Sequence, residues 1–94
     1  MKILVVCGHG LGSSVMVEMN AQEALKNLAA PADIEVEHSD IMTASPEMAD
    51  LFICGRDLAE NAQRLGDVLV LDNILDKEEL QQKLQQKLQA LNMI

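Results

Sequence analysis

Hydrophobic residues along the chain gather in four short runs, each followed by a longer stretch in which apolar and polar residues mix. Three runs are almost continuously apolar, which is typical of strands in a parallel sheet that is covered on both faces. The remaining run alternates Ile34 and Val36 with glutamates, which predicts a half-exposed edge strand. The four predicted strands are residues 2–6, 34–38, 51–54 and 68–71.

The stretch after the first run has the spacing and the end signals of a long helix. Its apolar residues recur at helical intervals up to about Ala29, and Pro31 then closes the helix. Ser13 or Ser14 is the predicted N-cap, because a short hydroxyl side chain can accept a hydrogen bond from the first turn.

Shorter helices are predicted around the third run. Ser45 followed by Pro46 is a helix-start signal, a cap residue with proline at the first helical position, and only a short helix fits before the next strand. Residues 57–65 predict a further helix, which Gly66 stops.

The last helix is predicted from a capping signal and a stripe of leucines. Asp76 with Glu79 three residues later resembles a capping box, with Asp in the place of Ser or Thr. The repeat QQKLQQKLQ then reads as an amphipathic helix that packs one face on the sheet. The stripe predicted to be buried comprises Leu80, Leu84, Leu88 and Leu91.

Strands that alternate with helices predict an α/β fold. Short connections and right-handed crossovers give a three-layer sandwich, with a four-stranded parallel sheet in the order 2-1-3-4 and a Rossmann-like arrangement. Residues 1–94 are expected to form a single domain, since no linker interrupts the pattern. Ligands of such sheets bind at the carboxyl ends of the strands, where the strand order reverses.

Composition supports an aliphatic core and argues against one class of function. Hydrophobic residues make up 49% of the 94 residues, yet there is one Phe and no Tyr or Trp. Methionine is an adaptable filler, so Met16, Met19, Met42 and Met48 are predicted to lie in the core. The net charge of −8 and the lack of aromatic stacking platforms disfavour binding to nucleic acid.

The two cysteines and the apolar runs indicate a cytoplasmic protein. No run approaches the ~20 apolar residues of a membrane span, and residues 1–6 lack the length and cleavage pattern of a signal peptide. Cys7 and Cys54 form no CxxC pair, so neither a disulfide scaffold nor a zinc knuckle is expected, and both are predicted to be reduced. No spacing of His, Asp or Glu suggests a metal, and no cofactor is expected.

The loop after the first predicted strand carries the candidate chemistry. Its sequence, CGHGLGSS, places three glycines between Cys7 and the start of a helix. Such a loop can turn successive backbone N–H groups toward one anion, and the helix N-terminus adds positive potential. A thiolate is a strong nucleophile, so Cys7 is the predicted reactive residue of a phosphate-sized site.

Known phosphate-binding loops match this sequence to different degrees. A P-loop needs a lysine after its last glycine, and a dinucleotide fingerprint needs GxGxxG spacing rather than GxGxG. The Cys-x5-Arg-Ser/Thr loop of tyrosine phosphatases matches better in the position of its cysteine and in its length. In that frame Ser13 stands where the arginine would be, and Ser14 fills the Ser/Thr position.

The loop, together with the preceding KILVV strand, resembles the IIB component of the sugar phosphotransferase system, most of all its L-ascorbate type. The galactitol and lactose types resemble it more loosely, and the resemblance covers the whole chain in length and element order. In that family a phosphoryl group passes from a phosphohistidine of the IIA component to the IIB cysteine. It then passes to the sugar bound by the membrane IIC component.

The resemblance implies a role for each residue of the loop. Cys7 would be the phosphorylation site of a phosphotransferase component, with L-ascorbate as the sugar, phosphorylated IIA as the donor and the IIC permease as the only link to the membrane. The implied phosphate cradle comprises Gly8, His9, Gly10, Leu11, Gly12, Ser13 and Ser14.

Other functions stay open on sequence grounds. A low-molecular-weight tyrosine-phosphatase-like enzyme would share the cysteine loop. An arsenate-reductase-like enzyme would pair Cys7 with Cys54 as a redox couple, but Cys54 is rather expected to be a packed core thiol. A module that only senses phosphate is a further alternative. His9 and His38 could contact phosphate or be solvated, and Arg56 could attract phosphate or form a surface ion pair.

Overall fold

Four parallel strands form the centre of the molecule. The structure is a computed structural model that describes residues 1–8 and 11–94, and of these the side chains of 1–8 and 15–94. The strands are β1 (Lys2–Cys7), β2 (Glu35–Asp40), β3 (Leu51–Gly55) and β4 (Val68–Leu71). They pair in parallel in the order β2-β1-β3-β4, so the predicted strand order is confirmed and the alternating run is an edge strand.

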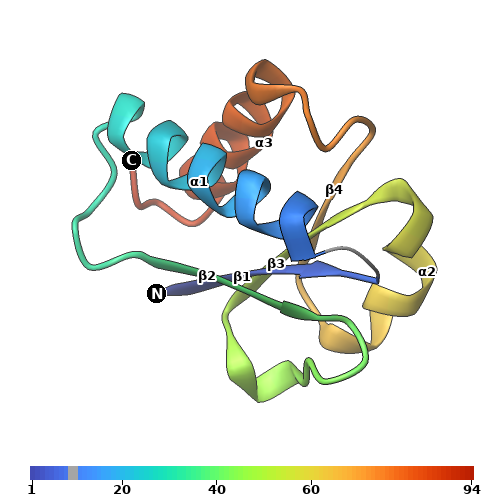
Figure 1. The fold of residues 1–94 in the computed structure, drawn as a ribbon. Coiled ribbons are helices and arrows are strands. Elements are labelled where there is room, and N and C mark those ends of the chain that lie inside the picture. Colours follow the sequence, from blue (N-terminus) through green and yellow to red (C-terminus); the bar gives the residue numbers. More distant parts are fainter. Residues whose placement is uncertain (9–10) are drawn as a thin grey trace.

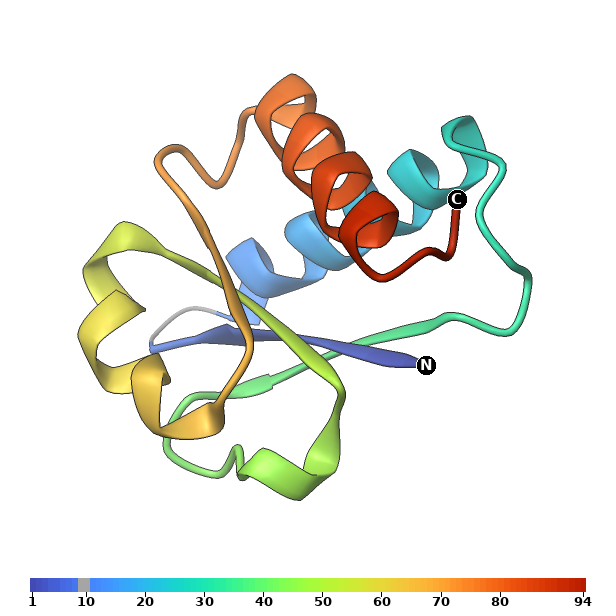
Figure 2. The same cartoon turned by 180° about the vertical axis from the view of Figure 1, so that it is seen from behind.

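Helices cover both faces of the sheet, as predicted for a three-layer α/β sandwich. The helices α1 (Leu11–Asn27) and α3 (Lys77–Ala90) pack side by side on one face. The short helix α2 (Ala59–Ala62) lies on the other face, and the view from behind shows the same separation (Figures 1 and 2).

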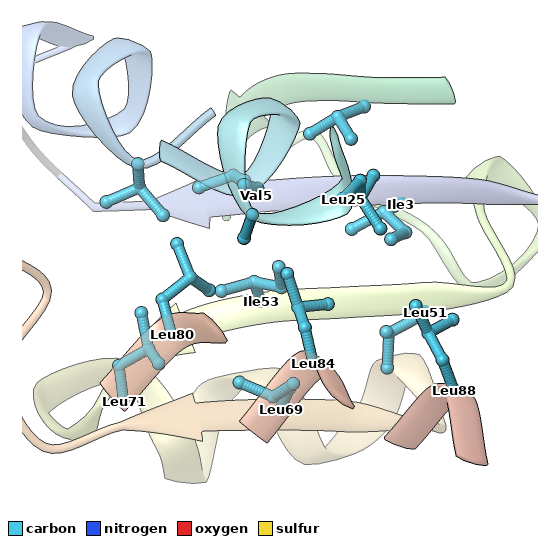
Figure 3. Packing of buried hydrophobic residues seen from close by; sticks show 14 residues of the cluster. Ile3, Val5, Leu25, Leu51, Ile53, Leu69, Leu71, Leu80, Leu84 and Leu88 are labelled. Carbon is cyan, nitrogen blue, oxygen red and sulfur yellow. The ribbon is translucent and has the colours of Figure 1, made fainter. Parts of the chain in front are cut away.

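Side chains of the central strands contribute alternately to two separate hydrophobic cores. Successive side chains of a strand point to opposite faces, so Ile3 and Val5 join one cluster while Leu4 and Val6 join the other. The same split recurs in β3, where Leu51 and Ile53 face α1 and α3 (Figure 3). Burial on both faces explains why these runs are continuously apolar.

The last helix packs three leucines above the sheet. Leu80, Leu84 and Leu88 are fully buried and lie against the strand side chains in Figure 3. Leu91 is 44% exposed, because the helix ends at Ala90 and the chain turns away there. The prediction of a four-leucine stripe is therefore correct for three positions and wrong for Leu91.

One helix start differs from the prediction and a second one agrees with it. The first helix begins at Leu11, so Ser13 and Ser14 lie in its first turn and do not precede it as an N-cap. Pro46 opens a single 3₁₀ turn, η1 (Pro46–Met48), because the next strand begins at Leu51 and leaves no room for more.

The predicted helix over residues 57–65 is three short pieces. A 3₁₀ turn, η2 (Arg56–Leu58), leads into α2, and a second 3₁₀ turn, η3 (Gln63–Leu65), follows it. Gly66 ends the segment with a φ of 109°, a left-handed conformation that glycine adopts without strain. The predicted stop is therefore confirmed, while the continuous helix is wrong.

The methionines do not fill the core. Met16 is 52% exposed, Met19 is 61% exposed and Met42 is 84% exposed, and Met48 is also at the surface. Helix α1 instead buries Val17, Ala21, Ala24 and Leu25. Valine, isoleucine and leucine from the strands and α3 already fill the space, so the prediction of methionine as core filler is wrong.

The start of α3 is held by two carboxylates with different partners. Asp76 Oδ1 accepts hydrogen bonds from the N–H groups of Glu78 (3.0 Å) and Glu79 (3.1 Å), which confirms the predicted N-cap. The Glu79 carboxylate accepts the N–H groups of Asp72 (2.7 Å) and Asn73 (2.9 Å) rather than that of Asp76. The predicted capping box is thus correct for the hydrogen bond that Asp76 accepts from Glu79 and wrong for the return bond. The Glu79 side chain instead holds the loop that follows β4.

We expect Glu79 to make folding stability depend on pH in a defined acidic window. The hydrogen bond from Lys83, together with the two backbone N–H groups, lowers the pKa of Glu79 from 4.5 to about 2. A carboxylate with a lowered pKa stabilises the folded state above its unfolded pKa, and this stabilisation is lost as the pH falls toward the folded pKa. Denaturant unfolding of Glu79→Gln should therefore show a loss of stability at neutral pH that shrinks between pH 4.5 and about 2.

The matched control is Glu78→Gln, since Glu78 lies in the same first turn but is exposed. It removes the same charge near the helix N-terminus without the hydrogen bonds to the β4 loop. A loss in Glu79→Gln that equals the loss in Glu78→Gln at every pH would contradict this role of Glu79.

Candidate functional site

The candidate site lies at the edge where the carboxyl ends of the strands meet. Cys7 is the last residue of β1 and pairs with Asp40, the last residue of β2. The Cys7 carbonyl accepts a hydrogen bond from the N–H of Ile41 at 3.0 Å, which fixes the backbone directly before the glycine-rich loop. Cys7 is partly exposed, as a residue that meets a partner must be.

The N-terminus of the first helix follows Cys7 closely in the chain. Helix α1 begins at Leu11, four residues after Cys7, and runs for 17 residues. The first four N–H groups of an α-helix have no acceptor within the helix, and they carry the positive end of its dipole. Leu11, Gly12 and Ser13, the first three residues of α1, contribute N–H groups of this kind.

Part of the predicted cradle lies outside what the structure describes. His9 and Gly10 are not among the described residues, and neither are the side chains of residues 11–14. Gly8 is described, and a Cβ placed on it would lie 3.3 Å from Leu58 Cδ2. Leu58 therefore packs closely against the backbone next to Cys7, and a larger residue at position 8 would push against it.

A cavity of about 380 Å³ opens beside Cys7. Its wall is mostly aliphatic and comes from both cores, with Val5 and Val17 from one side and Val6 and Ile41 from the other. Asp57 and Asn61 add a carboxylate and an amide, and the described residues that line it include no lysine or arginine. A phosphoryl group on Cys7 would thus depend on backbone N–H groups rather than on cationic side chains of this wall.

Gly55 is required for the shape of this cavity. A Cβ at position 55 would lie 2.8 Å from Asp57 Oδ1 and 2.9 Å from Ile74 Cγ2, closer than such atoms can approach. Both Asp57 and Ile74 line the cavity, so a side chain at this position would displace its wall. The sequence indicated a turn at Gly55 but not this close packing.

Cys54 has the environment of an inert core thiol. It is 2% exposed and belongs to the cluster under α2, together with Phe52 and Val6. Burial, and to a lesser degree the charge of Asp57, raises its pKa to about 11. A protonated, buried thiol is a poor partner for thiol exchange, which argues against the arsenate-reductase alternative even though Cys54 also lines the cavity.

The other polar residues singled out in the sequence have structural partners. His38 Nδ1 lies 3.0 Å from Glu18 Oε1 and so links β2 to α1. Arg56 Nε lies 3.7 Å from Asp72 Oδ1 in an exposed ion pair, which is one of the two roles that the sequence left open for Arg56. Neither His38 nor Arg56 lines the cavity. Within the described part of the chain, no three His, Cys, Asp or Glu residues are grouped as metal ligands would be.

Several residues of the site were missed by the sequence analysis. Leu58 and Asn61 follow the third strand by a few residues, and their spacing on one short helical segment was the available signal. Arg64 is another: its guanidinium donates hydrogen bonds to the carbonyls of Ile41 and Ala44. Nothing in the local sequence of Arg64 indicates these contacts, because they join segments that are twenty residues or more apart.

Comparison with protein families shows which family the chain belongs to. Residues 2–86 match the family described as "PTS system, Lactose/Cellobiose specific IIB subunit". The chain belongs to this IIB family. IIB domains act in sugar phosphotransfer and work with IIA and IIC partners, so the resemblance drawn from the loop is confirmed at the level of the IIB component. The match does not distinguish an L-ascorbate type.

Two solved structures share the fold of this IIB domain. One is the lactose-specific IIB component domain of the phosphoenolpyruvate:carbohydrate phosphotransferase system from Streptococcus pneumoniae. It has 20% identity and a TM-score of 0.55, and the match covers 99% of this chain and 96% of that one. The other is a low-molecular-weight protein tyrosine phosphatase from Bacillus subtilis, with 17% identity, a TM-score of 0.59, and coverage of 98% and 97%. The comparison with curated protein sequences gives no match.

We expect the two thiols of this IIB domain to differ widely in reactivity. A pKa of about 11 leaves roughly one Cys54 thiol in ten thousand ionised at pH 7, and the side chain is also buried. Under native conditions iodoacetamide should therefore modify Cys7 and leave Cys54 intact, as read by peptide mass spectrometry. Cys54→Ser should react like the wild type, and Cys7→Ser should react only once unfolded. Equal native rates at the two cysteines would contradict the assignment of Cys54 to the core.

Proposed function

We propose that this IIB domain is a phosphocarrier that holds a phosphoryl group on Cys7. The observation that carries the proposal is the position of Cys7, at the carboxyl end of a central strand and four residues before a 17-residue helix. The donor is a phosphohistidine of a IIA protein, and the acceptor is a sugar bound to the membrane IIC protein. The whole chain, residues 1–94, acts as one cytoplasmic domain that reaches the membrane only through IIC.

Each transfer is a displacement at phosphorus. The Cys7 thiolate attacks the phosphorus of the phosphohistidine, so an S–P bond forms, the N–P bond breaks and the neutral imidazole leaves with the electron pair. In the second step a sugar hydroxyl attacks the same phosphorus, the S–P bond breaks and the thiolate is regenerated, while a base of the partner takes the hydroxyl proton. The loop from Gly8 to Ser14 is proposed to bind the phosphoryl oxygens through its backbone N–H groups and hydroxyls.

The cavity favours a carrier over a phosphatase. A cysteine phosphatase stabilises the transition state with an arginine that binds two phosphoryl oxygens at once, and this chain has Ser13 at that position in the loop. Its two arginines are engaged elsewhere, Arg56 with Asp72 and Arg64 with two backbone carbonyls. Without a guanidinium the site can bind a phosphoryl group but gives little help to its hydrolysis.

The sugar is proposed from the loop alone. The sequence CGHGLGSS resembles the L-ascorbate type, so L-ascorbate is the substrate to test first, with lactose and cellobiose as comparisons. The sugar itself binds to IIC, and the IIB domain contributes the phosphoryl group.

Met42 is proposed to contact the partner protein that covers Cys7, because its side chain is 84% exposed and lines the cavity.

The experiment compares release of phosphate with and without an acceptor. The protein is phosphorylated by a IIA donor and isolated, and the bound phosphoryl group is then followed in buffer and in vesicles that contain IIC with each sugar. We expect slow loss in buffer and fast loss with IIC and L-ascorbate, because the described wall of the cavity has no arginine to stabilise the transition state of hydrolysis.

Rapid release in buffer over many turnovers would overturn the carrier proposal in favour of a phosphatase. Fast release with lactose or cellobiose but not with L-ascorbate would keep the carrier and correct the sugar. Vesicles without IIC are the control for nonspecific loss.

A further inference from the structure

Arg64 makes two hydrogen bonds that join η3 to a distant loop. Its Nη1 donates to the carbonyl of Ala44 at 2.9 Å, and its Nη2 donates to the carbonyl of Ile41 at 2.6 Å. Both carbonyls belong to the loop between β2 and η1, on the side of the sheet that α2 covers. A guanidinium has a planar fork of donors and can hold two acceptors in fixed geometry, whereas an ammonium group acts as a point donor.

The same loop contacts the end of the strand that carries Cys7. The Ile41 N–H donates to the Cys7 carbonyl at 3.0 Å, so the backbone of Ile41 is bonded to Cys7 through its N–H and to Arg64 through its carbonyl. Asp40 Oδ1 accepts the Met42 N–H at 2.9 Å and tightens the turn. Ile41 and Met42 also line the cavity beside Cys7.

We propose that Arg64 is a positioning residue for phosphoryl transfer. It fixes the loop from Ile41 to Ala44, and through the Ile41 N–H it holds the backbone of Cys7 in the orientation that transfer needs. Arg64 does not line the cavity, so its effect reaches the reaction through the loop. This inference rests on the proposed function of Cys7 as the phosphoryl carrier.

Neighbouring packing keeps this role separate from folding as a whole. Ile41 and Ala44 are buried in the cluster under α2, and Ala62 and Leu65, on either side of Arg64 in sequence, are buried in the same cluster. These apolar contacts remain when the guanidinium is removed. Loss of Arg64 should therefore loosen the loop without unfolding the domain.

Arg64→Gln tests the inference, with Arg56→Gln as the matched control. Both variants remove one positive charge, but Arg56 makes an exposed ion pair with Asp72 and lies outside the cavity wall. We expect Arg64→Gln to lower the maximal rate of transfer from phosphorylated IIA about tenfold, since small misplacements of reacting groups are costly, with KM unchanged within about twofold. Arg64→Lys should recover part of the rate, and Arg56→Gln should match the wild type.

Hydrogen exchange provides a second readout that needs no donor protein. The Ile41 amide should exchange faster in Arg64→Gln than in the wild type, while amides of β3 keep their protection. A rate loss without faster exchange at Ile41 would overturn the inference, as would a wild-type maximal rate in Arg64→Gln. If Arg64→Gln fails to fold, Arg64→Lys decides: an intermediate rate in the folded variant supports the inference, and a wild-type rate overturns it.

The outcome for the proposed function is separate. If the wild-type protein takes no phosphoryl group from IIA, the proposed function of Cys7 fails, and with it the role of Arg64 in transfer. If the wild type is phosphorylated and the Arg64 variants match it, the proposed function stands and the inference about Arg64 fails.

Discussion

Burial of the two central strands on both faces is the constraint on which the rest of this structure depends. Side chains of β1 and β3 alternate between the core under α1 and α3 and the core under α2, and those of both strands in the two clusters are almost fully buried. Removing a large aliphatic side chain from such a core costs about 2–5 kcal/mol, a large part of the stability of a small domain. Because the register cannot slip without exposing these side chains, the strand ends, and Cys7 with them, are fixed at one edge.

That fixed edge explains both what the site contains and what it lacks. Parallel strands deliver Cys7, Asp40 and Gly55 to the same end of the sheet, and the helix that follows β1 turns its N–H groups toward it. The lining residues are mainly the last aliphatic side chains of each core, so the cavity wall carries a carboxylate and an amide but no described cation. A IIB domain needs to hold a phosphoryl group and release it to an acceptor, and an apolar wall with backbone donors suits that task better than a guanidinium clamp does.

The fold was largely predictable because the strand pattern depends on short-range signals. Continuous apolar runs predicted β1, β3 and β4, alternation predicted the edge strand β2, and the order of elements predicted the sheet topology. Predictions failed where contacts between distant segments determine the local structure. The broken helix around α2, the exposed methionines and the contacts of Glu79 all depend on what packs nearby rather than on the local sequence.

The candidate site was likewise predictable only where a local motif marks it. Cys7 and its glycine-rich loop were visible as a local motif, because a cysteine, three glycines and two serines follow one strand directly. The contacts of Arg64 with the loop after β2 and of Leu58 with Gly8 were not predicted, since each joins segments that are remote in sequence. The raised pKa of Cys54 follows from burial in the apolar run of β3 and from Asp57, which is three residues away in the sequence.

The central claim is that the phosphoryl group is carried by the Cys7 sulfur. The direct measurement is tandem mass spectrometry of the protein after incubation with phosphorylated IIA, under conditions that preserve the S–P bond, for the wild type, Cys7→Ser and Cys54→Ser. The account predicts a phosphoryl group on Cys7 in the wild type and in Cys54→Ser, and none in Cys7→Ser. A phosphoryl group on His9 or His38, or one that persists in Cys7→Ser, would contradict it.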